Sequence, residues 1–379
     1  MKPRVGVIGG GQLARMMILP AVNLGIELKV LAEAEGSSAS LATTAVGDYT
    51  LYETVAQFAK TVDVITFDHE HVPLEVLRQL EASGVSVQPP SRALAFAQNK
   101  LHMRHRLREL GLPMPVWAEV QNREDLQEFL NGNGGECILK TPIGGYDGKG
   151  VRVIRSVEDA HAWLEPEFLA SVGGVLLAEE KVDFVREVAQ LSARRPSGEW
   201  TPWPLVQTTQ QHGVCAAVIS PAPGANAETI AKAAEIAQQV AEGIGVTGVL
   251  AVEMFETPNG RLLINELAMR PHNSGHFSIE GSVTSQFEQH LRAVLDLPLG
   301  STDARAEWAV MVNLLGTDDK NDFVSGYAEV LAGHPSAKVH TYGKSPRKGR
   351  KMGHVTVVGD KLEEVSNEAN ATAQALLQG

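Results

Sequence analysis

A glycine-rich loop between two short apolar segments constrains the fold of this chain more than any other stretch. Residues 137–154 read CILKTPIGGYDGKGVRVI, and both ends have the length and apolar character of β-strands. Glycines let backbone N–H groups approach a phosphate without a Cβ in the way, and Lys140 and Lys149 add positive charge for the same oxygens. The loop lacks the G-x-x-x-x-G-K-[ST] pattern of a Walker loop. We therefore predict a phosphate-binding hairpin, with an ordinary glycine-rich turn as the alternative.

The composition of the chain limits which binding partners and which cellular location we expect for it. The chain has 379 residues, enough for two or three domains, and its 44% hydrophobic and 21% charged residues are typical of globular proteins. A formal net charge of −12 disfavours nucleic acid as a partner. The first residues lack the apolar segment of a signal peptide, no apolar run approaches the length of a membrane span, and the two cysteines lack metal-binding spacing. We expect a cytoplasmic protein with no nucleic-acid or membrane partner.

The chain opens with a βαβ pattern. A buried strand at 5–8 leads into three glycines, a helix follows to about residue 24, and a second strand is expected at 27–32. A glycine turn at a helix N-terminus is a place where an anion binds. The spacing G-x-G-x-x-A, followed by Glu33, also satisfies a dinucleotide fingerprint. A nicotinamide-binding dehydrogenase or sensor therefore stays open as an alternative.

A third strand of this region ends in a cluster of acidic and imidazole groups. The strand is expected at 63–67, and Asp68-His69-Glu70-His71 follow it directly. Open α/β sheets bind ligands just beyond the carboxyl ends of their strands, so these side chains are candidate ligand contacts, with a solvated loop as the alternative. A short strand at 85–87 and a proline pair close this part, and we place the first domain boundary near residue 98.

From residue 99 onward, helices and strands alternate. A basic helix is expected at 99–110, and the capping box Ser156-x-x-Asp159 predicts a helix with apolar positions as far as residue 168. Further strands are expected at 115–120, 175–182, 186–194 and 201–207, and a helix at 226–244.

Two strands that carry acidic residues form the second candidate site. The segments 248–256 and 261–266 flank the turn TPNG, which is typical of a hairpin and brings Glu253 close to Asn265 and Glu266. Carboxylates within apolar strands are costly unless a cation pairs with them. Mg²⁺ is bound by one or two carboxylates together with substrate phosphates. The hairpin therefore predicts a metal–nucleotide site, with exposed edge carboxylates as the alternative.

The last third adds an arginine–histidine loop and a basic cluster. Arg270 follows the acidic pair closely enough to contact a phosphoryl group, and His272 and Asn273 add hydrogen-bonding groups. A helix at 283–295 follows, then strands at 307–315, 327–331 and 354–358 and a final helix after residue 360. The run KSPRKGRK at 344–351 suits a small phosphorylated ligand in so acidic a chain, with a solvated surface as the alternative.

The order of these features resembles the ATP-grasp superfamily, in which the nucleotide lies between two α+β lobes. Within it, the chain resembles the family of 5-(carboxyamino)imidazole ribonucleotide synthases in motifs that span nearly its whole length: GGGQL at 9–13, EHV at 70–72, GGYDGKG at 144–150, NELA at 265–268, RPHNSGH at 270–276 and GRKMGH at 349–354. The formate-dependent glycinamide ribonucleotide transformylases share much of this pattern and form the alternative. The GGGQL start and the His272-Asn273 pair favour the carboxylating family.

The resemblance implies a fold of mixed α/β and α+β class in three parts. These are a Rossmann-like pre-ATP-grasp domain at 1–98, two ATP-grasp lobes at 99–296 and a small C-terminal domain at 297–379. It implies ATP-dependent carboxylation of 5-aminoimidazole ribonucleotide with bicarbonate in purine (IMP) biosynthesis, a C–N ligase activity. It also implies Mg²⁺, for which Mn²⁺ could substitute, and a homodimer.

The resemblance also implies roles for individual residues. The expected ATP contacts are Lys100, Lys140, Gly145, Tyr146, Asp147, Gly148, Lys149, Gly150, Val151, Glu179, Glu180, Lys181, Val182, Glu187, Gln210 (usually histidine in the family), Asn265 and Glu266. The expected metal ligands are Glu253 and Glu266. The expected catalytic residues are Tyr146, Asp147, Arg270, His272 and Asn273, and the expected substrate contacts are Gly11, Gln12, Leu13, Glu70, Arg347, Arg350 and Lys351.

Overall fold

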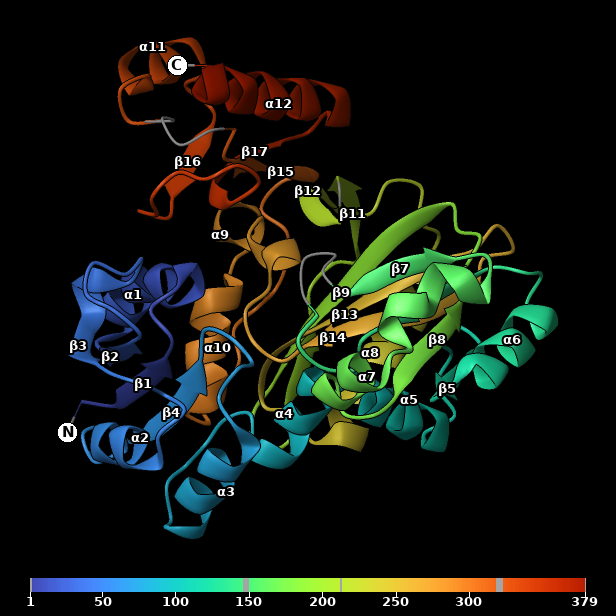
Figure 1. Cartoon of the computed structure of the whole chain (residues 1–379). Coiled ribbons are helices and arrows are strands. Elements are labelled where there is room, and N and C mark those ends of the chain that lie inside the picture. Colours follow the sequence, from blue (N-terminus) through green and yellow to red (C-terminus); the bar gives the residue numbers. More distant parts are fainter. Residues whose placement is uncertain (1, 146–149, 212, 318–322, 379) are drawn as a thin grey trace.

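Three β-sheets organise the chain, which is seen here in a computed structural model that describes residues 2–145, 150–211, 213–317 and 323–378. Figure 1 shows the N-terminal part in blue, a central body of green and yellow strands, and the C-terminal part in red. The fold class expected from the sequence, with Rossmann-like, ATP-grasp and C-terminal parts, is confirmed. Four predicted site residues, Tyr146, Asp147, Gly148 and Lys149, lie outside the described residues.

The N-terminal sheet is parallel, with strand order β3-β2-β1-β4. Its strands are β1 (Arg4–Ile8), β2 (Glu27–Ala32), β3 (Thr43–Val46) and β4 (Val64–Phe67), and its helices are α1 (Gln12–Leu24), α2 (Tyr52–Ala59), α3 (Leu74–Ala82) and α4 (Ser91–Gln98), with a short 3₁₀ helix η1 (Ser40–Ala42). The strand order reverses between β1 and β4, and this is where doubly wound sheets bind ligands. The strand predicted at 85–87 is wrong: only Val87 forms an isolated bridge, to Ile65.

A smaller antiparallel sheet holds the two strands that flank the glycine loop. Its order is β5-β8-β6-β7, from β5 (Trp117–Val120), β6 (Cys137–Lys140), β7 (Val151–Ile154) and β8 (Leu176–Glu180), with helices α5 (Lys100–Glu109) and α6 (Arg123–Gly132). The single helix predicted after Ser156 is wrong in its extent. The capping box forms, but it opens a 3₁₀ helix, η2 (Val157–Trp163), and α7 (Pro166–Ser171) follows. Pro166 explains the break, because proline fits the first turn of a helix but not its interior.

The large sheet runs from the ATP-grasp part into the C-terminal part without interruption. Its order is β14-β13-β9-β11-β12-β15-β17-β16, and the short strand β10 pairs with β9 outside this order. The strands are β9 (Arg186–Arg194), β10 (Trp200–Pro202), β11 (Val206–Gln211), β12 (Val214–Ser220), β13 (Gly248–Glu256), β14 (Leu262–Ala268), β15 (Trp308–Leu315), β16 (Lys338–Thr341) and β17 (Lys351–Gly359). The remaining helices are α8 (Ala227–Ile244), α9 (Ser278–Gly281), α10 (Gln286–Val294), α11 (Tyr327–Gly333) and α12 (Leu362–Gln378), with the 3₁₀ helix η3 (Asn273–Gly275).

Two strand predictions in this region are wrong. The strand predicted at 201–207 is divided between β10 and β11, since Pro204 between them has no N–H to donate to a neighbouring strand. The segment predicted as a strand at 327–331 is helix α11. Its alanine, glutamate and leucine are good helix formers, and in this helix only Val330 is buried.

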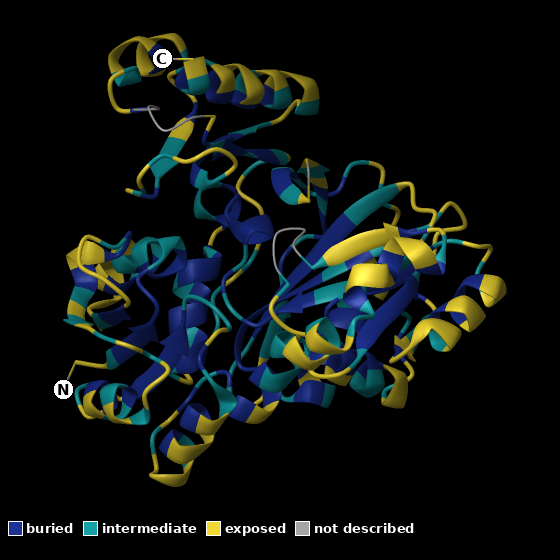
Figure 2. Ribbon diagram, viewed as in Figure 1, coloured by how far each residue is buried: buried dark blue, intermediate teal, exposed yellow. Residues whose placement is uncertain are grey.

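Helix α10 joins the N-terminal part to the large sheet. Its Phe287, Leu291 and Val294 share a hydrophobic core with α1 and β1. The buried His290 on the same helix bonds Thr66 of β4 through Nε2 (2.8 Å) and accepts from the Val249 N–H of β13 through Nδ1 (3.0 Å). In Figure 2 central strands such as β1, β9 and β13 are largely buried, whereas the edge strand β7 is largely exposed. Exposed residues also gather on the outer faces of helices such as α6 and α12. None of the helices in the described ranges is long and apolar enough to cross a membrane.

Candidate active site

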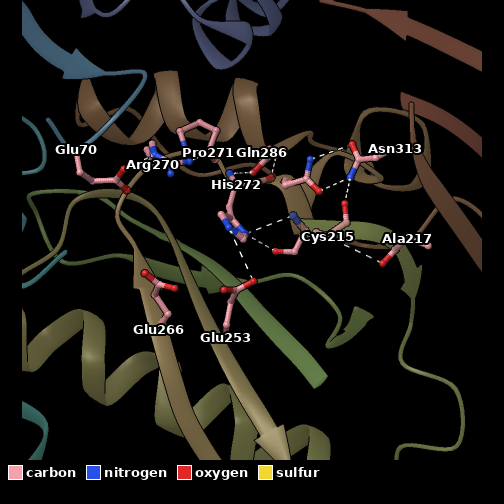
Figure 3. A network of polar contacts seen from close by, with 12 residues as sticks. Glu70, Cys215, Ala217, Glu253, Glu266, Arg270, Pro271, His272, Gln286 and Asn313 are labelled. Carbon is pink, nitrogen blue, oxygen red and sulfur yellow. Dashed lines mark hydrogen bonds and ion pairs between the residues drawn. The ribbon is translucent and has the colours of Figure 1, made fainter. Parts of the chain in front are cut away.

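A β-bulge places the predicted metal ligands together. In the β13–β14 ladder Glu253 lies opposite Glu266, whereas Met254 lies opposite Ile264, so Asn265 is the extra residue. The bulge lies directly beside the acidic pair. Figure 3 shows Glu253 and Glu266 extending from the two strands into the same space. The bulge thus allows two successive residues of β14, Asn265 and Glu266, to carry polar side chains into the site.

Two of the lysines predicted to contact ATP, Lys100 and Lys140, reach this bulge. Lys100, at the start of α5, places Nζ 2.9 Å from Glu266 Oε1. Lys140, at the end of β6, places Nζ 3.1 Å from Asn265 Oδ1 and 2.6 Å from Glu179 Oε2. The strand that precedes the glycine loop therefore meets the carboxylate hairpin through direct side-chain contacts. This arrangement provides two cations beside a carboxylate pair, as a bound triphosphate requires.

Arg104 is a member of this cluster that the sequence did not reveal. It is fully buried, and its Nε lies 2.5 Å from Glu179 Oε1. Its two terminal nitrogens donate to the backbone carbonyls of Ile264 (2.9 Å) and Asn265 (2.8 Å) at the bulge. Burial alone would raise the pKa of Glu179, but the Arg104 and Lys140 cations lower it to about 2. The spacing of Lys100 and Arg104, four residues apart on one helix face, is the signal that could have indicated this residue.

Glu253 lies in a surplus of negative charge. Burial, followed by the nearby Glu266 and Glu187, raises the pKa of Glu253 to about 8, against the opposing effect of Lys351 and Arg270. Glu187 comes from the neighbouring strand β9 and accepts a hydrogen bond from Gln210. Within the described ranges, no group of three or more His, Cys, Asp or Glu side chains is arranged to hold a metal ion. The pair Glu253 and Glu266 fits a Mg²⁺ ion whose remaining ligands come from substrate phosphates. Two buried carboxylates close together need a cation to balance their negative charge.

The other wall of the site comes from the loop after β14. Arg270 is paired with Glu70 of the N-terminal part, with 2.7 Å between Nε and Oε2. The ring Nε2 of His272 lies 4.0 Å from Glu253 Oε1. Burial, with Arg270 and Lys351 nearby, lowers the pKa of His272 to about 3, so its imidazole is neutral. Two predicted catalytic residues, Arg270 and His272, therefore lie beside the predicted metal ligand.

Asn273 is placed differently from its two neighbours. Its side-chain amide exchanges two hydrogen bonds with Asn313 of β15, at 3.1 and 2.7 Å, and Asn313 also donates to the Cys215 carbonyl (2.8 Å). Figure 3 shows this network leading away from Glu253. The amide of Asn273 is thus engaged in joining the loop to the large sheet.

The predicted substrate contacts of the N-terminal part surround the start of α1. A Cβ at Gly11 would lie 1.9 Å from Asp68 Oδ2, so only glycine fits there. Gln12 accepts a hydrogen bond from Lys344, and Leu13 packs its side chain into the core. Asp68 accepts from the Ala14 N–H (2.7 Å) and Glu33 from the Gly10 N–H (3.1 Å). Carboxylates of the chain itself therefore occupy two donors that a dinucleotide would need, which disfavours the dehydrogenase alternative.

The basic cluster is divided by the structure. Lys351 begins β17 and lies close enough to affect the pKa values of Glu253 and His272. Arg350 donates to the Ser345 carbonyl (2.9 Å), and Arg347 is exposed. Lys344, which the sequence analysis did not single out, is the cation that contacts Gln12. The part of the cluster nearest the N-terminal sheet is therefore Lys344 and not Arg347.

Three of the predicted nucleotide contacts, at 180–182, border a pocket between the end of β8 and the β13–β14 turn. Its volume is about 350 Å³, and its lining includes Glu180, Lys181, Val182 and Leu263. Glu180 accepts from the Val116 N–H (3.0 Å), and Lys181 pairs with Glu136 (3.1 Å). A second pocket of about 450 Å³ borders the described glycines 144 and 150 of the loop. Gly150 has φ +73°, which is a left-handed conformation that favours glycine.

A glycine-rich hairpin, a bulged carboxylate pair and the lysines that join them are the arrangement expected of an ATP-grasp protein. Three family models match in order: the ribonucleotide synthetase preATP-grasp domain over residues 1–98, the ATP-grasp domain over 105–287 and the phosphoribosylaminoimidazole carboxylase C-terminal domain over 309–368. The N5-carboxyaminoimidazole ribonucleotide synthase of Mycobacterium bovis is 44% identical over 381 residues, which is 100% of this chain and 88% of the relative. The chain belongs to the N5-carboxyaminoimidazole ribonucleotide synthase family.

Solved structures agree with this assignment. The N5-carboxyaminoimidazole ribonucleotide synthetase of Thermus thermophilus has a TM-score of 0.87 and 38% identity, and the match covers 99% of each chain. The Aspergillus clavatus enzyme in complex with ADP and 5-aminoimidazole ribonucleotide has a TM-score of 0.88 and 32% identity, covering 100% of this chain and 99% of the other. The family resemblance predicted from the sequence motifs is thereby confirmed.

Proposed function

We propose that this chain carboxylates the exocyclic amine of 5-aminoimidazole ribonucleotide with bicarbonate, giving 5-carboxyaminoimidazole ribonucleotide, ADP and phosphate in de novo purine biosynthesis. As a member of this family it is an ATP-dependent ligase that forms a C–N bond. The observation that carries the proposal is the position of Glu253. This carboxylate lies opposite Glu266, which contacts Lys100, and 4.0 Å from His272, on the loop of Arg270. Glu253 thus lies between the proposed triphosphate site and the polar side chains of the loop that carries Arg270 and His272.

The nucleotide side of the proposal rests on the lysine–carboxylate cluster. Lys100 and Lys140 would share the negative charge of the triphosphate, and Asn265 and Glu266 lie between them. The strand end at 179–182, with Glu187 and Gln210 on the large sheet, would contact the base and ribose. The solved ADP complexes of relatives support the use of ATP.

Glu253 and Glu266 would hold Mg²⁺, or Mn²⁺ in its place. When bound, the ion would neutralise charge on the phosphate oxygens as a Lewis acid. Their surplus of negative charge is the feature of this chain that favours such an ion. A member of the family with these two carboxylates would accordingly lose turnover when divalent ions are chelated.

The second substrate would bind between the loop at 270–276 and the N-terminal sheet. Arg270, held by Glu70, and neutral His272 offer N–H donors to an anion such as bicarbonate or carboxyphosphate. Gln12 at the start of α1, Lys344 that contacts it from the segment before β17, and Lys351 at the start of β17 are suited to a phosphate on the ribotide. The Aspergillus clavatus relative binds ADP and 5-aminoimidazole ribonucleotide together.

The chemistry then proceeds in two transfers. A bicarbonate oxygen attacks the γ-phosphorus of ATP, the bond to ADP breaks, and carboxyphosphate forms. The exocyclic amine takes the carboxyl carbon, either directly or after release of CO₂, while phosphate leaves and the amine loses a proton. Since carboxyphosphate hydrolyses readily, the site must exclude water during both transfers.

One comparison of substrates tests this function. Phosphate release from ATP would be measured with bicarbonate plus 5-aminoimidazole ribonucleotide, with glycinamide ribonucleotide plus formate, and with neither. We expect release only in the first mixture. Release that requires glycinamide ribonucleotide and formate would assign the chain to the transformylase activity, and NADH binding in a fluorescence titration would favour the dehydrogenase alternative.

The remaining expectations belong to the same proposal. We propose a cytoplasmic homodimer, as the family resemblance implies, with working domains at 1–98, 99–296 and 297–379. Sedimentation equilibrium would test the dimer, and a single species at the monomer mass of 40.7 kDa would contradict it.

A further inference from the structure

One buried glutamine forms hydrogen bonds with both the backbone N–H and the backbone carbonyl of His272. Gln286, the first residue of α10, accepts from the His272 N–H through Oε1 (2.8 Å) and donates to the His272 carbonyl through Nε2 (2.8 Å). The same Nε2 lies 2.9 Å from His276 Nδ1, and the side chain is fully buried. Figure 3 shows Gln286 behind His272, on the side away from Glu253. The fit is tight, since a Cβ at Gly275 would lie 2.4 Å from Gln286 Oε1.

These contacts fix the orientation of the amide and, through it, one imidazole tautomer. A backbone N–H can only donate and a carbonyl can only accept, so Oε1 and Nε2 of Gln286 cannot be exchanged. Nε2 is therefore the donor to His276 Nδ1, and the ring proton of neutral His276 lies on Nε2.

The tautomer of His272 follows in the same way. The backbone N–H of Ser274 donates to His272 Nδ1 (3.4 Å), with the Ser274 hydroxyl 2.9 Å from the same atom. The ring proton of neutral His272 therefore lies on Nε2, the atom that faces Glu253 at 4.0 Å. In this way His272 presents an N–H donor to the site and its ring cannot act there as a base.

We propose that Gln286 is a positioning residue, which fixes the backbone of His272 so that its Nε2–H points at the ligand bound beside Glu253. The inference rests on the proposed function for the identity of that ligand, but not for the geometry. His272 is the group that would touch the substrate, and Gln286 acts through it. Because a displacement of about 1 Å in a reacting group can lower a rate a hundredfold, loss of this support affects turnover before it affects nucleotide binding.

The chain offers a matched control on the same helix. Gln289 is also fully buried on α10, and its side-chain amide also bridges the N–H and carbonyl of one backbone residue, Gly300, at 2.8 Å each. Gly300 lies in the segment after α10 and outside the proposed site. Replacing either glutamine by methionine removes two backbone hydrogen bonds of the same kind. Gln286→Met also removes the bond to His276 Nδ1, so both variants should lose stability and Gln286→Met should lose more.

The kinetic experiment compares Gln286→Met with Gln289→Met in the full chain. We expect kcat for ribotide carboxylation to fall at least tenfold in Gln286→Met, with the KM for ATP within twofold of wild type. We expect Gln289→Met to keep kcat within twofold although its Tm also decreases. Equal losses of kcat in the two variants, or a retained kcat in Gln286→Met, would overturn the proposal.

A second measurement does not depend on turnover or on the folding of a variant. In wild-type protein labelled with ¹⁵N-histidine, the ring ¹⁵N shifts of His272 and His276 should both report the Nε2–H tautomer. An Nδ1–H tautomer for either ring in the wild type contradicts the inference. If the wild type does not carboxylate the ribotide, the proposed function fails, but the tautomers of His272 and His276 still decide the inference about Gln286.

Discussion

Arg104 and Glu179 form an ion pair in which both side chains are buried, with 2.5 Å between Nε and Oε1 and side-chain exposures of 0% and 2%. The pair links α5 to β8, and Arg104 also binds the two carbonyls at the bulge of β14. Glu179 in turn contacts Lys140. A structural ion pair thus positions both a predicted phosphate-binding lysine and the strand of a predicted metal ligand.

Removing Arg104 should be costly. Breaking a buried pair leaves an uncompensated charge, so Arg104→Leu is expected to lose about 3–5 kcal/mol of unfolding free energy. Urea denaturation would measure this loss. Arg123→Leu is the control, because Arg123 pairs with Glu158 on the exposed surface and such pairs contribute about 0–1 kcal/mol. Equal losses of unfolding free energy in the two variants would show that the buried pair stabilises the fold no more than an exposed pair.

The stabilisation by Glu179 should depend on pH with a definite sign. The Arg104 and Lys140 cations lower its pKa to about 2 in the folded chain, against the ordinary value of 4.5. Its contribution is therefore complete above about pH 4.5 and is lost as the pH falls toward 2. The difference in unfolding free energy between wild type and Glu179→Gln should narrow over this range. Two parallel stability curves would contradict the assignment.

Much of this site could be predicted from the sequence because its signals are local. The turn chemistry at 257–260 indicates the hairpin that brings Glu253 to Glu266, and the glycine spacing indicates the loop after Lys140. The supporting residues were not found in this way, and for Arg104 the sequence offers only its four-residue spacing from Lys100. Arg104 and Gln286 bind backbone groups that only the folded topology brings near, and a buried arginine or glutamine has the same local pattern as an exposed one.

The metal-site prediction concerns Glu266. Glu266→Gln keeps the size of the side chain but removes the charge that pairs with Lys100. We expect turnover to fall at least about a hundredfold, because a catalytic metal supplies several kcal/mol of transition-state stabilisation. Circular dichroism and Tm should stay near wild type, since this side chain is 45% exposed. ATP hydrolysis at the wild-type rate by the folded variant would remove Glu266 from the metal site.

The final prediction concerns the basic cluster, where the structure separates three lysines. Lys351 lies near Glu253 and His272, Lys344 contacts Gln12, and Lys348 is exposed. A charged hydrogen bond to phosphate contributes about 1.5–3 kcal/mol. Lys351→Ala and Lys344→Ala should therefore each raise the KM for the ribotide about ten- to a hundredfold.

The KM for ATP should barely change in either variant, because Lys100 and Lys140, which contact Glu266 and Asn265, are the cations proposed to bind the nucleotide. Lys348→Ala is the matched control and should leave both KM values unchanged. Raised salt should weaken ribotide binding in the wild type more than in Lys351→Ala, because partly exposed charge pairs are screened. Steady-state kinetics with each substrate varied separately would decide the assignment. An unchanged ribotide KM in Lys351→Ala would leave Lys344 as the phosphate contact and would exclude Lys351 from ribotide binding.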